Sequence, residues 1–298
     1  MNALVIVGML LASREQVYQG AGFAGQLIPR FERGYLLFAK RPCQLTVYHP
    51  SGRLLFTQTL QGPKGMACSA IQAAVDSDGT FAVGISYAVP EGYAGGIVLL
   101  GANGKQTAVI ETKRFMPSHV AFGPDHSIWS IGWQRDAVQH EIGDREDYAI
   151  VRRFNREGRP TGAFLQRSLW PGKGDPVYAH GGHWSLAVAK DRLGAFVRSN
   201  EVHEWIEWNF DGQLISRTPL PEEPSGRAYT VSGKLYATLR DSQKLVVLDT
   251  QSQTWKPVPE PVERFKLLLG ADGDELVFTT LNSSVGTAEL VWFKPQQQ

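Results

Sequence analysis

The chain has 298 residues, enough for one large domain or two small ones. Hydrophobic residues make up 43% and charged residues 20%, which is ordinary for a folded soluble protein. The net charge of +1 gives no electrostatic basis for binding nucleic acid or an anionic membrane. Two cysteines are too few for a disulfide-rich scaffold or for a metal site of four thiolates.

The chain opens with a short apolar run, Ala3–Ala12, which is too short to span a bilayer as a helix. It is typical of the core of a signal peptide, but no Lys or Arg precedes it. A start codon assigned too far downstream would explain that absence, and a buried N-terminal strand is the alternative. We therefore predict that residues 1–13 are a clipped signal peptide or an N-terminal strand, and that 14–298 form one domain. The first interpretation predicts a periplasmic or secreted protein, the second a cytoplasmic one.

Short apolar stretches then follow in pairs, each pair joined by a turn rich in Gly, Asp, Asn or Ser. The clearest pair is His119–Phe122 and Ile128–Trp133, joined by a Gly-Pro-Asp turn. Two pairs make a block of four strands. In chain order the predicted strands are 26–31, 35–40, 44–48 and 53–60; 69–75, 80–87, 96–100 and 105–112; 119–122, 128–133, 148–154 and 159–167; 184–189, 195–199, 204–208 and 213–220; 227–231, 234–240, 244–249 and 254–258; 265–269, 275–281 and 289–294.

The spacing of the blocks indicates the architecture. Their first turns fall at Gly34, Gly79, His126, Gly194, Gly233 and Gly273. The repeat is roughly 40–47 residues once two insertions, 135–147 and 169–183, are removed, and four short strands at that period are typical of β-propeller blades. We therefore predict an all-β protein, a six-bladed β-propeller with four-stranded antiparallel blades.

The last block is one strand short, while residues 14–24 precede the first block without a role. If the N-terminal segment pairs with the last blade, the ring closes and no blade is left with an open edge. Two β-sandwich domains are the competing interpretation. The repeat disfavours it, because no linker-like stretch interrupts the blocks.

Two of the hairpins carry a family resemblance through an apolar strand, an Asp-containing turn and a second apolar or aromatic strand. The residues are Ala73, Val75, Asp76, Asp78 and Gly79, and Val120, Phe122, Pro124, Asp125, Ile128 and Trp129. This pattern resembles six-bladed propellers of the NHL/YWTD-like class over about 26–294. No WD dipeptide closes the blades, which disfavours the seven-bladed WD-repeat class.

The candidate binding surface is the propeller face that carries the two insertions and the loop Ala88–Gly95. Long loops on a rigid scaffold are where ligands usually bind, and the opposite face has only tight turns. We expect a non-enzymatic propeller, a monomer, that recognises a small anionic ligand or a protein there without a cofactor. No nucleophile motif, phosphate-binding loop or dinucleotide fingerprint supports catalysis.

Basic residues near the ends of second strands give this face its candidate ligand contacts: Arg41, Arg135, Arg198 and Arg240. Converging guanidinium groups would suit a carboxylate or phosphate. The alternative is that these arginines pair with local carboxylates such as Asp136, Glu201 and Asp241; each has such a neighbour except Arg41. Trp170 and Tyr178, in the second insertion, either stack on a ligand or pack their loop onto the blade.

A metal-dependent hydrolase is the alternative function. Resemblance to six-bladed lactonases of the gluconolactonase type implies a calcium ion in the central channel, and Asn200, Asp241 and Asn282 are at strand-end positions that could hold it. Glu32 lies on the tight-turn side, where it does not match the acidic ligand of those enzymes. His180 and His183 form a second metal hypothesis, with Asp175 as a further ligand.

The cysteines, Cys43 and Cys68, would each flank the first hairpin block. They either pair in an oxidising compartment or remain two half-buried thiols. Sequence alone does not show the Cα separation that a disulfide requires.

Overall fold

The protein is described here from a computed structural model. It describes residues 14–19, 29–40, 42–49, 51–135, 146–172, 174–177, 186–199, 202–225, 227–258, 267–282 and 287–295. In these residues the fold is all-β, with two short 3₁₀ turns, η1 (Pro63–Gly65) and η2 (Arg167–Leu169). The strands form one sheet of eight strands and four sheets of four.

The eight-stranded sheet joins the two ends of the described chain. Its order is β1 (Arg14–Gln19), β24 (Thr287–Phe293), β23 (Glu275–Asn282), β22 (Leu267–Asp272), β2 (Arg30–Glu32), β3 (Tyr35–Lys40), β4 (Gln44–Tyr48) and β5 (Leu54–Thr59). All its pairs are antiparallel except β2 with β22, which meet in parallel at Phe31 and Gly270. The N-terminal strand β1 pairs antiparallel with β24 over its whole length.

Each four-stranded sheet is antiparallel and follows chain order. Their strands are β6 (Cys68–Val75), β7 (Phe81–Val89), β8 (Gly92–Leu100) and β9 (Gln106–Lys113); β10 (Phe115–Phe122), β11 (Ile128–Gln134), β12 (Ala149–Phe154) and β13 (Pro160–Gln166); β14 (Leu186–Val188), β15 (Arg192–Ser199), β16 (Val202–Asn209) and β17 (Leu214–Pro219); β18 (Tyr229–Val231), β19 (Lys234–Thr238), β20 (Leu245–Asp249) and β21 (Thr254–Pro257).

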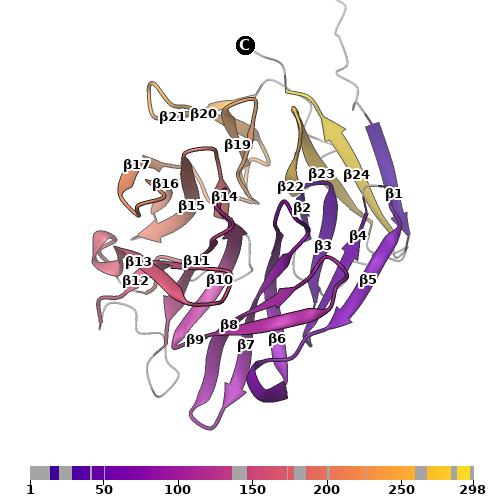
Figure 1. Cartoon of the computed structure of the whole chain (residues 1–298). Helices are drawn as coiled ribbons and strands as arrows, with labels where there is room; N and C mark the ends of the chain where they lie inside the picture. The colour runs from indigo at the N-terminus through magenta and orange to yellow at the C-terminus, as the bar shows by residue number, and fades with distance from the viewer. Residues whose placement is uncertain are drawn as a thin grey trace, which may run out of the picture.

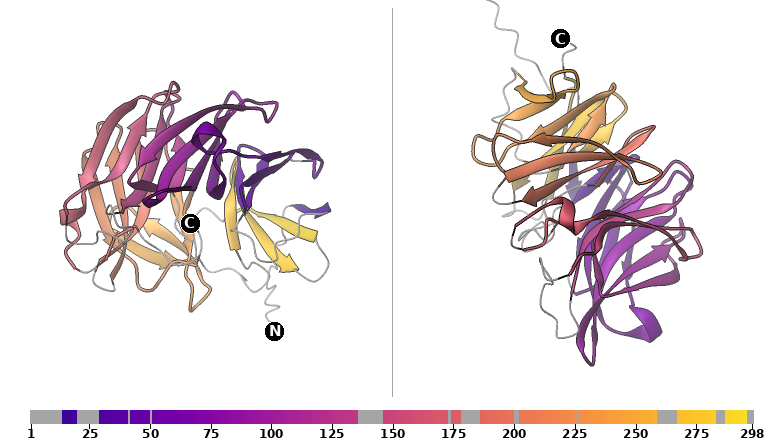
Figure 2. Two further views of the ribbon diagram at one scale, coloured as in Figure 1. Left: turned by 90° about the horizontal axis from the view of Figure 1, so that it is seen from below. Right: turned by 90° about the vertical axis from the view of Figure 1, so that its left-hand side faces the viewer.

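The sheets are arranged radially, as blades around an axis (Figure 1). First strands of neighbouring blades lie side by side: β10 contacts β6 and β14, β2 contacts β6 and β22, and β18 contacts β22. Seen from below, the yellow C-terminal strands lie next to the indigo N-terminal ones (Figure 2). This is the architecture of a β-propeller.

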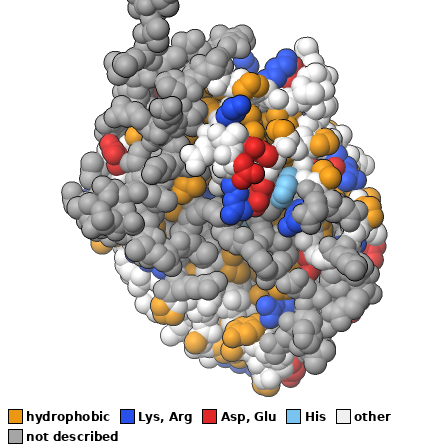
Figure 3. Space-filling view, turned by 180° about the vertical axis from the view of Figure 1, so that it is seen from behind, with side chains coloured by type: hydrophobic (Ala, Val, Ile, Leu, Met, Phe, Trp, Pro, Cys, Tyr) orange, Lys and Arg blue, Asp and Glu red, His pale blue; other side chains and the backbone are white. Residues whose placement is uncertain are grey.

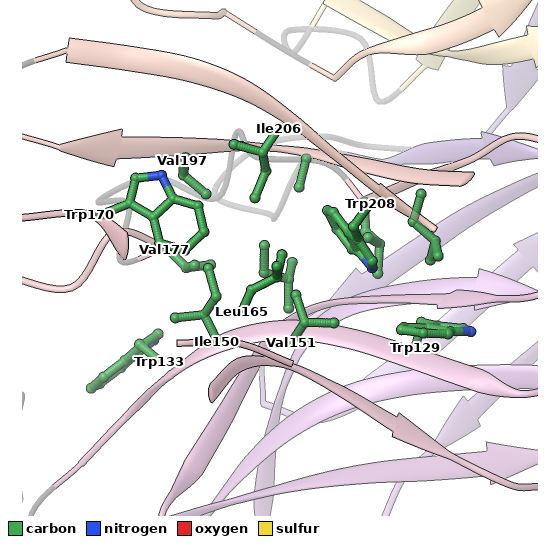
Figure 4. Packing of buried hydrophobic residues seen from close by; sticks show 14 of the residues in the cluster. Trp129, Trp133, Ile150, Val151, Leu165, Trp170, Val177, Val197, Ile206 and Trp208 are labelled. Atoms are coloured by element: carbon green, nitrogen blue, oxygen red, sulfur yellow. The ribbon is translucent and has the colours of Figure 1, made fainter. Parts of the chain in front are cut away.

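Apolar side chains fill the space between successive blades. The largest cluster lies between the β10–β13 sheet and the β14–β17 sheet and contains Trp129, Trp133, Trp170 and Trp208 (Figure 4). Strands buried on both faces explain the near-continuous apolar runs seen in the sequence. Burial of several aromatic rings at one boundary supplies much of the force that holds the two blades together.

The hairpin expected at 119–133 is confirmed as β10 and β11, with a turn at 123–127. Trp129 is fully buried, stacks on Phe164 at a centroid distance of 5.5 Å and donates a 2.9 Å hydrogen bond from Nε1 to Oγ of Ser127. The hairpin is therefore part of the structural scaffold.

The loop predicted at Ala88–Gly95 is wrong. Strands β7 and β8 continue through it and pair up to Val89 and Gly92, which leaves a tight turn. The glycines are needed for close packing rather than for flexibility. A Cβ on Gly95 would lie 2.0 Å from the carbonyl oxygen of Phe115, so only glycine lets β10 approach β8 this closely.

No helix in the described residues is long and apolar enough to cross a membrane. Residues 1–13, for which a signal peptide or a strand was predicted, lie outside the described residues.

Candidate functional site

The first strands of the blades bring polar side chains to the axis of the propeller. These side chains are Arg30 and Glu32 on β2, Gln72 on β6, His119 on β10 and Arg227 just before β18; all but Glu32 are more than nine-tenths buried. In the four-stranded sheets the first strand is an edge strand, so part of its backbone lacks a strand partner. Buried backbone groups of this kind require hydrogen bonds from elsewhere, and polar side chains can supply them.

β-Bulges interrupt several first strands close to these positions. The register shifts between Ala70 and Gln72 in β6, and between Pro117 and His119 in β10. A bulge re-aims the side chains and backbone groups that follow it. The shifts therefore account for how mainly apolar strands present Gln72 and His119 beside the axis.

Arg30 links three blades. Its Nη1 donates to the carbonyl of Val120 in β10 at 3.1 Å, and its Nη2 donates to Glu32 Oε1 at 2.9 Å and to the carbonyl of Leu186 in β14 at 3.5 Å. The second oxygen of Glu32 accepts the backbone N–H of Val75 in β6 at 3.0 Å. Both carboxylate oxygens of Glu32 are thus engaged, and the Arg30–Glu32 pair ties together the first strands around the axis.

A second set of contacts lies around His119. Nη1 of Arg227 donates to the carbonyl of Pro29 at 3.2 Å, and Oε1 of Gln72 accepts the N–H of Val120 at 2.8 Å. Burial, followed by the charges of Arg227 and Arg30, holds the pKa of His119 well below its usual range. The imidazole is therefore neutral at pH 7, in a positive local potential.

A cavity of about 360 Å³ lies at the ends of the first strands, next to the first turns. Its lining comprises Arg30, Phe31, Glu32, Arg33, Phe122, Pro124, Ala187, Val188, Ala189, Tyr229, Thr230 and Ala271. We call it the axial cavity. It lies at the tight-turn end of the blades, whereas the sequence hypothesis placed binding on the opposite face.

The charged groups of the axial cavity carry an excess of one positive charge. Arg33 is exposed, lies in the β2–β3 turn with φ of 50°, and has no hydrogen-bond or ion-pair partner among the described residues. Arg30 is matched by Glu32. The guanidinium of Arg33 is therefore left to meet solvent or a ligand.

The strand-end arginines predicted as ligand contacts lie apart from this cavity. Arg135 is packed between aromatic rings, 5.0 Å from the ring of Trp133 and 5.5 Å from that of Tyr93. Arg240 forms a 2.9 Å ion pair with Glu223, where Asp241 was the expected partner, and Arg198 is exposed. Arg41 lies outside the described residues.

The face seen from behind shows carboxylate side chains gathered beside basic side chains and a histidine (Figure 3). The visible charge there has both signs.

Trp170 is a core residue rather than an exposed stacking surface. Its side chain is 1% exposed, and the guanidinium of Arg217 lies 5.5 Å from its ring. The start of the second insertion is braced nearby, since Arg167 donates to the carbonyl of Gly174 at 2.8 Å. Tyr178, predicted alongside Trp170, lies outside the described residues.

The residues of the calcium hypothesis are placed only in part. Asp241 is exposed in the β19–β20 connection, Asn282 ends β23, and Asn200 lies outside the described residues, as do His180 and His183. Asp175 accepts a hydrogen bond from the hydroxyl of Tyr148. Within the described residues no three His, Cys, Asp or Glu side chains group closely enough to hold a metal ion.

The two cysteines form a disulfide. It joins Cys43, just before β4, to Cys68 at the start of β6, with the Cα atoms 5.3 Å apart. The bridge covalently links neighbouring blades.

Sequence reasoning did not single out Arg30, Gln72, His119 or Arg227, and only one signal could have found some of them. Gln72 and His119 each lie seven residues before a left-handed turn residue, Gly79 (φ 82°) and His126 (φ 64°). A polar residue repeated at one position of otherwise apolar first strands indicates an axial side chain.

No protein-family model matches the chain, and no curated protein matches it. Similar solved structures include the PQQ-bound aldose sugar dehydrogenase of Streptomyces coelicolor, 15% identical with a TM-score of 0.54, covering 94% of this chain and 98% of that one. A streptogramin B lyase is 14% identical with a TM-score of 0.54, covering 95% and 88%. A candidate gluconolactonase is 14% identical with a TM-score of 0.55, covering 97% and 96%. Identities this low show the shared propeller fold and leave the activity open.

Proposed function

We propose that this propeller is a binding protein for a small anionic ligand, which it takes into the axial cavity. The observation that carries the proposal is the charge of the cavity lining. Glu32 is engaged by Arg30 and by the backbone of Val75, so the positive charge of Arg33 beside them is not matched by a described carboxylate.

The chemistry favours a carboxylate or a phosphate. A guanidinium presents two parallel N–H donors to two oxygens of such a group, which makes the contact both strong and directional. Electrostatic attraction is stronger between protein walls than in open water, because the walls exclude part of the solvent. Arg30, held by backbone carbonyls on two other blades, gives the floor of the cavity a fixed shape.

The proposal is tested by isothermal titration calorimetry with acetate, inorganic phosphate and short-chain organic acids. Arg33→Gln should weaken binding of the best anion at least tenfold. Arg53→Gln is the matched control, because Arg53 is also exposed in a turn and does not line the cavity. Failure of every anion to bind the wild-type protein would refute the proposal.

The finer architecture that supports this site is a ring of six blades. On this interpretation the eight-stranded sheet is two blades, β22–β23–β24–β1 and β2–β3–β4–β5, and in the described residues their strands pair with each other only at Phe31 and Gly270. Buried clusters at six successive blade boundaries support the count, since a closed ring has as many boundaries as blades. The strand β1, supplied by the N-terminal segment, would then close the ring.

A calcium-type hydrolase remains the second candidate, favoured by the similar structures that are named as enzymes, among them the candidate gluconolactonase. Metal analysis of the purified protein separates the two functions. A stoichiometric divalent ion, with a melting temperature that falls on addition of EDTA, would favour the hydrolase.

The protein is further proposed to act in an oxidising compartment, as a periplasmic or secreted protein. The disulfide between Cys43 and Cys68 supports this, because such bridges persist where thiols are not kept reduced. Mass spectrometry of protein alkylated without reduction should find neither thiol modified.

A further inference from the structure

We infer that the ligand of the axial cavity is a monocarboxylic acid with a small apolar body, about the size of one ring with a short chain. This inference rests on the proposed function and adds the class of anion. Three properties of the lining carry it: the number of charges, the chemistry of the remaining walls and the volume.

The charges of the cavity lining favour a ligand with a single negative charge. Arg30 and Glu32 form a 2.9 Å ion pair and cancel, and Arg33 adds one positive charge. A monocarboxylate would bring the cavity to neutrality. A phosphate dianion would leave one negative charge in excess next to Glu32, and a charge between protein walls is costly unless it is paired.

The uncharged residues that line the cavity favour a ligand whose body is apolar. Ala187, Val188, Ala189 and Ala271 line the cavity and are partly exposed, and Pro124 is exposed at its edge. These side chains come from three blades, so the apolar surface surrounds the space rather than forming one strip. Covering them with a ligand removes apolar area from water, which acetate or another purely polar anion would not do.

The volume sets the size. About 360 Å³ is at the small end of the range for ligand pockets, roughly 300–1,000 Å³. It suits one ring with a short acidic chain and is too small for a long acyl chain to lie within it. Thr230, exposed in the lining, adds a hydroxyl that can bond to a carboxylate oxygen.

The test compares four probes by calorimetry at pH 8: 3-phenylpropionate, 3-phenylpropanol, acetate and inorganic phosphate. The first has charge and apolar body together, the second lacks the charge, the third lacks the body, and the fourth is largely a dianion. We expect 3-phenylpropionate to bind at least tenfold more tightly than each of the others. Val188→Ser should weaken 3-phenylpropionate about threefold or more and leave acetate unchanged.

The outcomes separate this inference from the function on which it rests. If acetate or phosphate binds as tightly as 3-phenylpropionate and Arg33→Gln weakens them, the anion site stands and the ligand class is wrong. If 3-phenylpropanol binds as well as 3-phenylpropionate, the carboxylate is not recognised and the inference is overturned. If no probe binds, both the inference and the proposed function fall.

Discussion

Nδ1 of His126 lies 2.8 Å from Oδ2 of Asp76, and the two residues come from the first turns of neighbouring blades. The side chain of Asp76 is 1% exposed and also accepts from Arg156, which reaches it from the outer turn of the same blade as His126. One buried carboxylate therefore holds together the turns at this end of the β6–β9 and β10–β13 blades.

Replacing this carboxylate should destabilise the protein. Burial raises the pKa of Asp76, but hydrogen bonds from Ser77, His126 and Arg156 outweigh burial and hold the pKa below its usual value. A carboxyl whose pKa is lowered by folding stabilises the protein above its unfolded pKa, near 3.9, and loses that contribution as the pH falls further. Asp76→Asn should lower the free energy of unfolding by about 2–3 kcal/mol at pH 7. The loss of stability below about pH 4 should then be smaller than in the wild type. Urea unfolding measures both effects, with the exposed Asp191→Asn as control.

His119 predicts a second pH dependence, in a different window. Its pKa is lowered by burial and by Arg227 and Arg30, so the unfolded chain takes up a proton near pH 6.5 and the folded protein does not. Stability should therefore fall as the pH is lowered from 7 to 5, by at most about 1.4 kcal/mol per pH unit. His119→Gln should remove this dependence of stability on pH between 7 and 5. The loss of stability below about pH 4, which comes from Asp76, should be unchanged. An unchanged slope between pH 7 and 5 in the variant would contradict the assignment.

Trp129→Ala should cost about 3–5 kcal/mol, because a fully buried indole is removed and its hydrogen bond to Ser127 is lost. Denaturant unfolding gives the value. Leu54→Ala on the outer strand β5, where the side chain is 50% exposed, should change stability by less than about 0.5 kcal/mol. Equal effects of the two substitutions would mean that Trp129 does not pack between blades.

Reduction of the disulfide should destabilise the protein by about 3.5 kcal/mol, the chain-entropy value for cysteines separated by 25 residues. The double variant Cys43→Ala/Cys68→Ala should match the reduced wild type. Urea unfolding with and without dithiothreitol checks the prediction. If dithiothreitol lowered the stability of the double variant as well, the effect would not come from this bridge.

Gly95→Ala should cost about 1–3 kcal/mol, because the new methyl group would meet the carbonyl of Phe115. Gly101→Ala is the control, since a Cβ there has no neighbour closer than 3.4 Å. Thermal melting of both variants tests whether this glycine-rich stretch is packed strand. If Gly95→Ala melted with the wild type, the stretch would behave as the loop first predicted.

The blade strands could be predicted from sequence because each depends on local chemistry. The hairpin around Trp129 shows this: a Gly-Pro-Asp turn between two apolar runs is sufficient to place it. The extension of β8 to Gly92 was not predictable in this way. Glycines usually indicate a loop, but here Gly95 allows the backbone of Phe115 in the next blade to pack closely against β8.

The axial residues were harder to predict, since their partners lie far away in sequence. Arg30 bonds to Val120 and Leu186, and nothing local to Arg30 indicates either contact. The strand-end arginines were predicted as ligand contacts because they recur in sequence, yet Arg240 pairs with Glu223 and Arg135 packs on aromatic rings. Recurrence along the chain is a guide to blade position and a poor guide to which charge is left for a ligand.

The pairing of β1 with β24 has a consequence for synthesis. A ribosome makes β1 before β2–β23 and β24 after them, so β1 has no partner while the strands between are made. During that time its backbone N–H and C=O groups are open to pairing with other chains. The blades between can fold in order as they emerge, but the last one is complete only when both ends of the described chain are present.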